Sequence, residues 1–179
     1  EKENFLKSVI ITVLQPCITR LVHTDDLTPK PTYQLKKAAE VSFFGRFNAL
    51  KCAASALAAS NAQNRSIIGL SSIFADEGQK GHSAYSALLG SLNSMTLPSA
   101  RDLSQFGIRV NNICAGFFSS PNGLGSQSVQ TREGIANLVP YPKRLGNSED
   151  LAHCVKFMIE NEYLNGVNLR LDGAMRTTP

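Results

Sequence analysis

Residues 65–114 read RSIIGLSSIFADEGQKGHSAYSALLGSLNSMTLPSARDLSQFGIRVNNIC, and this stretch decides the fold. The β-branched, apolar run at 65–71 is typical of a buried strand. The segment 83–105 has the length and composition of a helix, and Gly107 closes it before a second apolar run at 108–114. A strand, a helix and a second strand in this order predict a β-α-β unit with parallel strands.

The rest of the chain continues the alternation. We expect strands at 9–14 and 167–171, a long helical segment at 33–61 with a change of composition at 41–45, and a helix at 147–160. The glycine-rich segment 115–141 predicts a long loop with at most a short helix. The fold class predicted is therefore α/β, a partial Rossmann-like parallel sheet of about four strands with flanking helices. Residues 1–179 are expected to form one domain.

Composition narrows the classes of function. The net charge is +4, but the basic residues are scattered, so a solvated surface is favoured over an RNA-binding one. Four cysteines stand far apart in apolar surroundings, which predicts buried, reduced thiols (Cys17, Cys52, Cys114 and Cys154). The three histidines have no metal-ligand spacing, and the longest apolar run, at 9–14, is far too short to span a bilayer.

The candidate catalytic residues lie at the junction of strand 65–71 and helix 83–105. Ser72 ends the strand, Tyr85 follows 13 positions later, and Leu89 comes four residues after Tyr85. A tyrosine has a pKa of about 10, so it needs a nearby positive charge to exchange protons near neutral pH. A basic residue at i+4 would provide that charge, whereas a leucine desolvates the phenol and raises its pKa. Lys80 precedes Tyr85 and is expected in the loop before the helix, where it is a weak substitute.

Three stretches, in the right order, carry a resemblance to a known family. They are IIGLSS at 67–72, GIRVNNI at 107–113, and the segment 164–174 that contains LNG and LDGA. Together with the Ser72–Tyr85 spacing, they make the chain resemble the short-chain dehydrogenase/reductase family. In that family the tyrosine transfers a proton at the substrate carbonyl, and a lysine four residues later lowers its pKa. Further stretches resemble a mitochondrial branch that acts on 3-hydroxyacyl-CoA and hydroxysteroid substrates (77–79, 95–98, 100–103 and 144–146). The resemblance covers residues 9–177, the C-terminal two-thirds of such a protein.

The departures from the family pattern fall on its functional positions. Leu89 replaces the lysine, Ser42 replaces an active-site asparagine, and Ala115 precedes Gly116 where the family has proline before glycine. Residues 15–18 read QPCI where the family has N-N-A-G, and no G-x-x-x-G-x-G turn for the cofactor pyrophosphate occurs. The resemblance therefore implies a vestigial site, with Ser72 and Tyr85 as catalytic remnants and Gly116 as a cofactor-binding remnant. It implies no cofactor on this chain alone, and NAD only if an N-terminal half is supplied elsewhere.

The same resemblance predicts surfaces that need partners. Strand 9–14 would be an unpaired sheet edge, and one face of the sheet would lack its covering helices. We expect protein subunits of a larger assembly to cover them, and a related dehydrogenase-like chain could dock through helices 33–61 and 83–105. The mild basicity leaves an RNA-containing assembly open.

Two hypotheses of function follow. The favoured one is a catalytically inactive, dehydrogenase-derived subunit with a structural role in a mitochondrial assembly. The alternative is an NAD(H)-dependent oxidoreductase of 3-hydroxyacyl-CoA or hydroxysteroid type, completed by a missing N-terminal half or by a partner chain.

Overall fold

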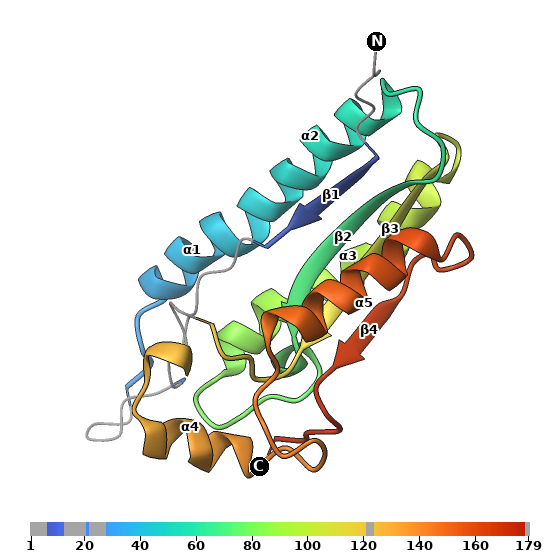
Figure 1. The fold of residues 1–179 in the computed structure, drawn as a ribbon. Coiled ribbons are helices and arrows are strands. Elements are labelled where there is room, and N and C mark those ends of the chain that lie inside the picture. Colours follow the sequence, from blue (N-terminus) through green and yellow to red (C-terminus); the bar gives the residue numbers. More distant parts are fainter. Residues whose placement is uncertain (1–6, 13–20, 22–27, 121–123, 178–179) are drawn as a thin grey trace.

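The structure is a computed structural model that describes residues 7–12, 21, 28–120 and 124–177. Its centre is a four-stranded parallel sheet in the order β1-β2-β3-β4 (Figure 1). The strands are β1 (Ser8–Ile11), β2 (Arg65–Ser72), β3 (Ile108–Ala115) and β4 (Asn168–Leu171). The predicted partial Rossmann-like α/β fold with about four strands is confirmed.

Helical elements follow β1, β2 and β3, and the alternation of strands and helices agrees with the sequence prediction. They are α1 (Tyr33–Ala39), a π-helix η1 (Glu40–Gly45), α2 (Arg46–Ala58), a 3-10 turn η2 (Ile73–Ala75), α3 (Ser83–Ser104), a 3-10 turn η3 (Leu124–Ser126), α4 (Val129–Ala136) and α5 (Ser148–Glu160). The π-helix coincides with the change of composition expected at 41–45. Among the described residues, no helix is long and apolar enough to cross a membrane.

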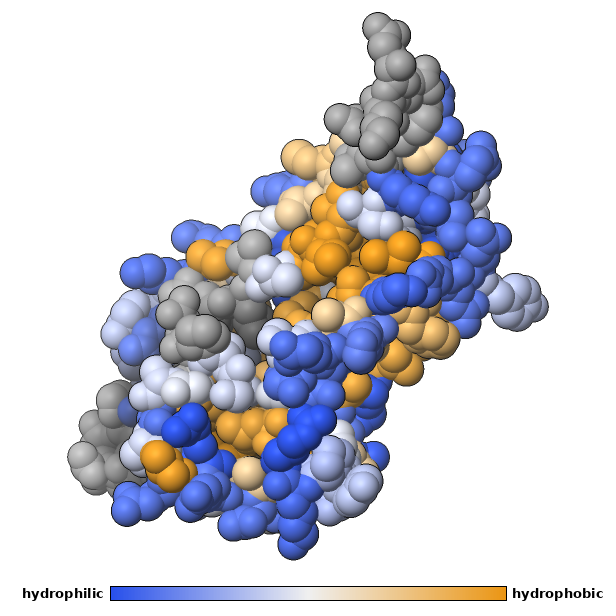
Figure 2. Space-filling model, in the orientation of Figure 1, coloured by the Kyte–Doolittle hydropathy of each residue, from blue (hydrophilic) through white to orange (hydrophobic). Residues whose placement is uncertain are grey.

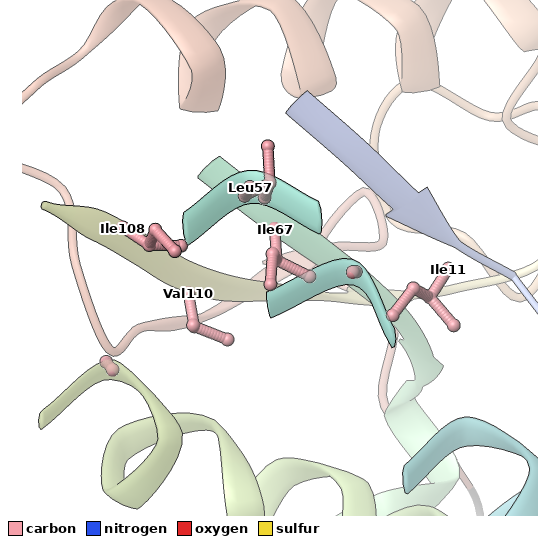
Figure 3. Close-up of a cluster of buried hydrophobic side chains, with 7 residues drawn as sticks. Ile11, Leu57, Ile67, Ile108 and Val110 are labelled. Carbon is pink, nitrogen blue, oxygen red and sulfur yellow. The ribbon is translucent and has the colours of Figure 1, made fainter. Parts of the chain in front are cut away.

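The two faces of the sheet follow from the alternation of side chains along its strands. On one face, a buried cluster that contains Ile11, Leu57, Ile67 and Val110 joins the sheet to α2 and α3 (Figure 3). On the other face, Ile68 and Ile113 pack against residues of α5. In Figure 1, α5 lies in front of the sheet and α3 lies behind it. Helices therefore cover both faces, but among the described residues α5 is the one helix on the second face.

The start of α5 shows how the sequence sets an element's boundary. Asn147 accepts a hydrogen bond from the backbone N–H of Asp150, and the Asp150 carboxylate accepts one from the Asn147 N–H, both at 2.9 Å. This capping box satisfies two backbone donors at the helix N-terminus. It explains why α5 begins at Ser148, one residue after the start that the sequence predicts.

Three expectations are corrected. The first strand is Ser8–Ile11 rather than 9–14, and positions 13 and 14 lie outside the described residues. The single helical segment expected at 33–61 is divided into α1, η1 and α2 and ends at Ala58. Cys52 is exposed, whereas Cys114 and Cys154 are buried free thiols as expected, and Cys17 lies outside the described residues. Apolar sequence neighbours misled the prediction for Cys52, because a helix turns adjacent residues to different faces.

Candidate functional site

The candidate site lies where β2 ends and α3 begins. Ser72 is the last residue of β2, and its Oγ accepts a hydrogen bond from the backbone N–H of Phe74 at 3.4 Å. This bond caps η2, the 3-10 turn that follows the strand. The hydroxyl of Ser72 therefore has a local structural role at the position where the family resemblance implies a catalytic one.

Tyr85 stands in the first turn of α3, and its ring lies among aromatic neighbours. The ring centroid of Phe74 lies 6.0 Å from that of Tyr85, and the ring of His82 lies 6.2 Å away. His82 itself stacks on Phe74 at 5.2 Å. Burial raises the pKa of Tyr85 above its ordinary value, and the positive charge of Arg46 opposes that rise only in part. The phenol is therefore held in its neutral form near neutral pH.

Leu89 occupies the position at which the family carries its lysine. Its side chain is 0% exposed and belongs to a cluster with Phe74 and Leu92, against which Tyr85 and Phe117 pack. The buried leucine places an apolar side chain beside Tyr85 and provides no positive charge near its phenol. Lys80, the nearest lysine before Tyr85, is exposed in the turn that precedes α3.

Ser42 occupies the position of the family's asparagine and is completely buried in η1. One helical turn later stands Arg46, which the sequence analysis did not single out. Arg46 is 4% exposed, and its guanidinium donates to the carbonyl oxygen of Leu70 on β2. Burial lowers the pKa of Arg46 to about 10, and the electrostatic interaction with Tyr85 opposes that shift. A buried cation therefore approaches Tyr85 from η1 and α2, and not from α3.

Arg46 is identified from the fold and from its burial, and not from the sequence. It lies 39 positions before Tyr85 in the sequence, so no local motif connects the two. The sequence gives no other signal for it, because the segment 33–61 carries further charged residues (Lys36, Lys37, Glu40 and Lys51).

Gly116 follows β3 directly and lies against the end of β4. A Cβ atom at this position would stand 2.9 Å from the Cα of Asp172, and the Gly116 N–H donates to the Leu171 carbonyl at 2.9 Å. Close packing of two strand ends is enough to require glycine here. The space beside Gly116 is thus filled by Asp172, which gives this residue a structural function.

The pocket nearest to the carboxyl ends of β3 and β4 has a volume of about 220 Å³. Its walls combine Phe117, Phe118 and Val139 with the polar residues Arg144 and Asp172. Neither Ser72 nor Tyr85 is among its lining residues. The arginine is already paired, because Arg144 makes two hydrogen bonds to the Asp150 carboxylate at 2.5 and 2.9 Å. The retained serine and tyrosine therefore do not open onto this pocket.

A second feature that the sequence analysis missed is a buried amide network beneath the site. The Asn112 amide donates to Asn93 Oδ1 at 2.9 Å and to Asn168 Oδ1 at 3.3 Å. The Asn168 amide in turn donates to the Asn93 carbonyl at 3.1 Å. These bonds tie α3, β3 and β4 together, and three asparagines far apart in the sequence gave no signal for them.

Two features of the chain bear on a dinucleotide cofactor. No G-x-x-x-G-x-G turn occurs in the sequence, and the space beside Gly116 is filled. The segment 15–18, which replaces the family's N-N-A-G, lies outside the described residues. Within the part of the chain that the structure describes, no group of three or more His, Cys, Asp and Glu side chains could hold a metal ion.

The chain is similar in sequence to a known protein family and to several of its relatives. The model of the family described as Enoyl-(Acyl carrier protein) reductase matches residues 17–175. The chain is 40% identical over 163 residues to 3-hydroxyacyl-CoA dehydrogenase type-2 of Bos taurus, with 83% of this chain and 62% of the relative covered. It is 32% identical over 143 residues to (3R)-3-hydroxyacyl-CoA dehydrogenase of Homo sapiens, with coverage of 78% and 53%.

The fold has a solved counterpart. The crystal structure of 3-hydroxyacyl-CoA dehydrogenase type-2 from Mycobacterium avium superposes with a TM-score of 0.88 at 32% identity. The match covers 97% of this chain and 68% of that chain. The chain thus spans 62% of the length of the bovine relative.

Proposed function

The chain belongs to the short-chain dehydrogenase/reductase family, and from this premise we propose that it is a catalytically inactive subunit with a structural role in a larger, mitochondrial assembly. One observation carries the proposal. At the position of the family's lysine stands Leu89, wholly buried in an apolar cluster against which Tyr85 packs.

The surroundings of Tyr85 support this proposal. A phenol whose pKa is raised by burial is a poor proton acceptor near neutral pH. The Ser72 oxygen caps η2, and Gly116 is explained by its contact with Asp172. Each retained family residue thus has a structural role that needs no reaction.

The alternative function rests on Arg46. This buried arginine brings a positive charge toward Tyr85, and a positive charge favours the phenolate. An NAD(H)-dependent oxidoreductase of 3-hydroxyacyl-CoA or hydroxysteroid type would then need the cofactor-binding half from elsewhere. Burial outweighs the charge of Arg46 in setting the pKa of Tyr85, so we favour the inactive subunit.

The test compares the wild-type chain with Tyr85→Phe, each tagged and expressed in cells from which the endogenous chain has been removed. The isolated assemblies are assayed with NAD and 3-hydroxybutyryl-CoA, and NADH formation is recorded. We expect both assemblies to give the same rate, whether that rate is zero or comes from another subunit. Tyr163→Phe is the matched control, because Tyr163 is 99% exposed.

The structural role has its own readout. Removal of the chain should lower the amount of the assembly, and Tyr85→Phe should restore it as fully as the wild type does. A loss of NAD-dependent turnover of about tenfold or more with Tyr85→Phe, at an unchanged amount of assembly, would establish the alternative.

A further inference from the structure

After β4 the chain folds back over the candidate site. The backbone takes positive φ angles at two successive residues, 61° at Gly173 and 63° at Ala174. Two neighbouring residues in the left-handed region reverse the direction of a chain. In Figure 1 the chain thus passes from β4 to the lower end of the molecule, and Thr177 contacts Glu77 in the loop that precedes α3. Residues 174–177 are called the strap below.

Glu77, in the loop between η2 and α3, holds this strap. Its Oε1 atom lies 2.7 Å from the guanidinium of Arg170 and 3.2 Å from that of Arg176. Its Oε2 atom accepts a hydrogen bond from the Thr177 N–H at 2.9 Å, and its backbone carbonyl accepts one from the Thr177 hydroxyl at 3.3 Å. The Glu77 side chain is 19% exposed, and hydrogen bonds to a charge that is mostly shielded from water are strong. One carboxylate therefore ties the strap and β4 to the loop before α3.

Met175 is the apolar part of the strap. It is 1% exposed and packs in a buried cluster with Ile73 and Val139. Ile73 is the first residue of η2 and follows Ser72 directly, so Met175 packs on the turn that the Ser72 oxygen caps. The strap therefore contacts the site in two ways, by charge at Glu77 and by an apolar side chain at Ile73.

The Met175 cluster forms a wall between the pocket and the site residues. Phe117 and Val139 line the pocket of about 220 Å³ at the carboxyl ends of β3 and β4, and both also pack with Met175. Phe117 packs in addition against the Leu89 cluster, which Tyr85 contacts. In Figure 2, a small apolar area bordered by hydrophilic residues is visible at the end of the molecule where the C-terminus lies in Figure 1. The side chains that part the pocket from Tyr85 are therefore supported by the strap.

The attachment of the strap has weak points. Ala174 adopts a left-handed φ, which costs free energy in a residue other than glycine, and its N–H is held by a hydrogen bond to Asp172 Oδ1 at 3.0 Å. Arg176 is 62% exposed, so solvent screens its ion pair with Glu77. Within residues 174–177, Met175 alone is buried. Few buried apolar contacts, exposed ion pairs and a strained turn are features of a segment that opens at a low cost in free energy.

We propose that residues 174–177 are a strap that closes the candidate site, with Glu77 as its latch and Met175 as its plug. When the strap leaves, the wall beside Met175 loses its support, and the pocket of about 220 Å³ becomes continuous with the surroundings of Ser72 and Tyr85. A molecule in that pocket reaches these two residues only in the open state. The inference goes beyond the proposed function, since it holds for an inactive subunit and for an active one.

The test measures how fast reagents reach Met175 in the wild-type chain and in Glu77→Gln, each tagged and isolated as in the test of the proposed function. Hydrogen peroxide oxidises exposed methionine to its sulfoxide, and peptide mass spectrometry follows each methionine separately. Glu77→Gln keeps the size of the side chain and removes its charge, so Met175 should be oxidised about tenfold faster. Met158 is the internal control, because it is 0% exposed beneath α5 and away from the strap. Its rate should stay within about twofold.

Tyr85 shows whether the site itself opens. Tetranitromethane nitrates tyrosine rings that it can reach, and nitration of Tyr85 in Glu77→Gln should be about threefold faster or more. Tyr163 is 99% exposed and serves as the reference for the reagent. Glu133→Gln is the matched control variant, since Glu133 is exposed on α4 and loses the same charge. It should change neither the oxidation of Met175 nor the nitration of Tyr85 by more than about twofold.

Arg176→Gln removes only the exposed ion pair of the latch and replaces Glu77→Gln if that variant does not fold. It should speed the oxidation of Met175 about threefold, because an exposed pair contributes less than a buried one. Three results would overturn the inference. The first is a wild-type rate at Met175 in both variants, and the second is an equal rise at Met175 and Met158, which would show a general loosening. The third is a faster rate at Met175 with no change at Tyr85, which would make the strap an anchor and not a cover of the site.

Discussion

Strand β1 has two neighbouring isoleucines in opposite situations. Ile11 is 8% exposed beneath α2, and Ile10 is 50% exposed beside α5. Both residues come from one apolar run, so composition gives no reason for the difference. The difference arises from the helices, because one face of the sheet is covered across β1, β2 and β3 and the other face is covered only as far as β2. Among the described elements, α5 alone covers this open face, so the cover depends on the contacts that hold α5.

The largest effect is expected from Arg109, which fastens the C-terminal end of α5. Its guanidinium donates to the carbonyls of Met158 and Ile159 at 2.9 and 2.8 Å, and to Asn64 Oδ1 at 2.9 Å. Burial lowers the pKa of Arg109, yet these acceptors keep the charge satisfied. Arg109→Met leaves buried carbonyls without donors and should lower the free energy of unfolding by about 3 kcal/mol or more.

Urea denaturation of both proteins measures this loss. Arg101→Met is a suitable control, because Arg101 is exposed on α3. If the two substitutions cost the same, Arg109 does not hold α5 on the sheet.

The second prediction compares the register partners directly. Ile68→Ala removes a fully buried side chain beneath α5 and should cost about 3 kcal/mol of unfolding free energy. Ile10→Ala should cost about 1 kcal/mol or less in the chain alone, because half of that side chain is already in water. Equal losses at the two positions in urea denaturation would mean that Ile10 is covered in solution.

The sequence predicted the positions of the strands better than it predicted which of their side chains are covered. Apolar runs such as 65–71 and 108–114 predicted β2 and β3 within one residue, because strands buried on both faces are rich in apolar residues. The run at 9–14 looks equally buried, but burial of Ile10 depends on what lies over it, and a single sequence does not contain that information. The same limit applies to Cys52 and to the division of the segment 33–61.

The candidate site shows the same limit in its chemistry. The spacing of Ser72, Tyr85 and Leu89 locates the site, because the three positions lie on a strand end and one helix start. Arg46 stayed hidden, since its contact with this site depends on a turn of π-helix and on the packing of η1 against α3. Local motifs thus predict where the candidate site lies, but tertiary contacts determine the charge beside the phenol of Tyr85.

The smallest effect concerns the N-terminal end of α5, where Asp150 closes the capping box. Hydrogen bonds from Arg144 and from the Asn147 N–H lower the pKa of Asp150 from its ordinary value of 3.8 to about 2. A carboxyl whose pKa is lower in the folded state stabilises that state above its unfolded pKa, and this contribution is lost as the pH falls toward 2. Because the pair with Arg144 is largely exposed, Asp150→Asn should cost only about 1 kcal/mol at pH 7. Urea midpoints measured from pH 7 to pH 2 should converge for the wild type and Asp150→Asn as the pH falls below 4. A difference that stays constant over this range would show that the cap, and not the charge of Asp150, stabilises α5, and the open face would then depend on Arg109 at the other end of the helix.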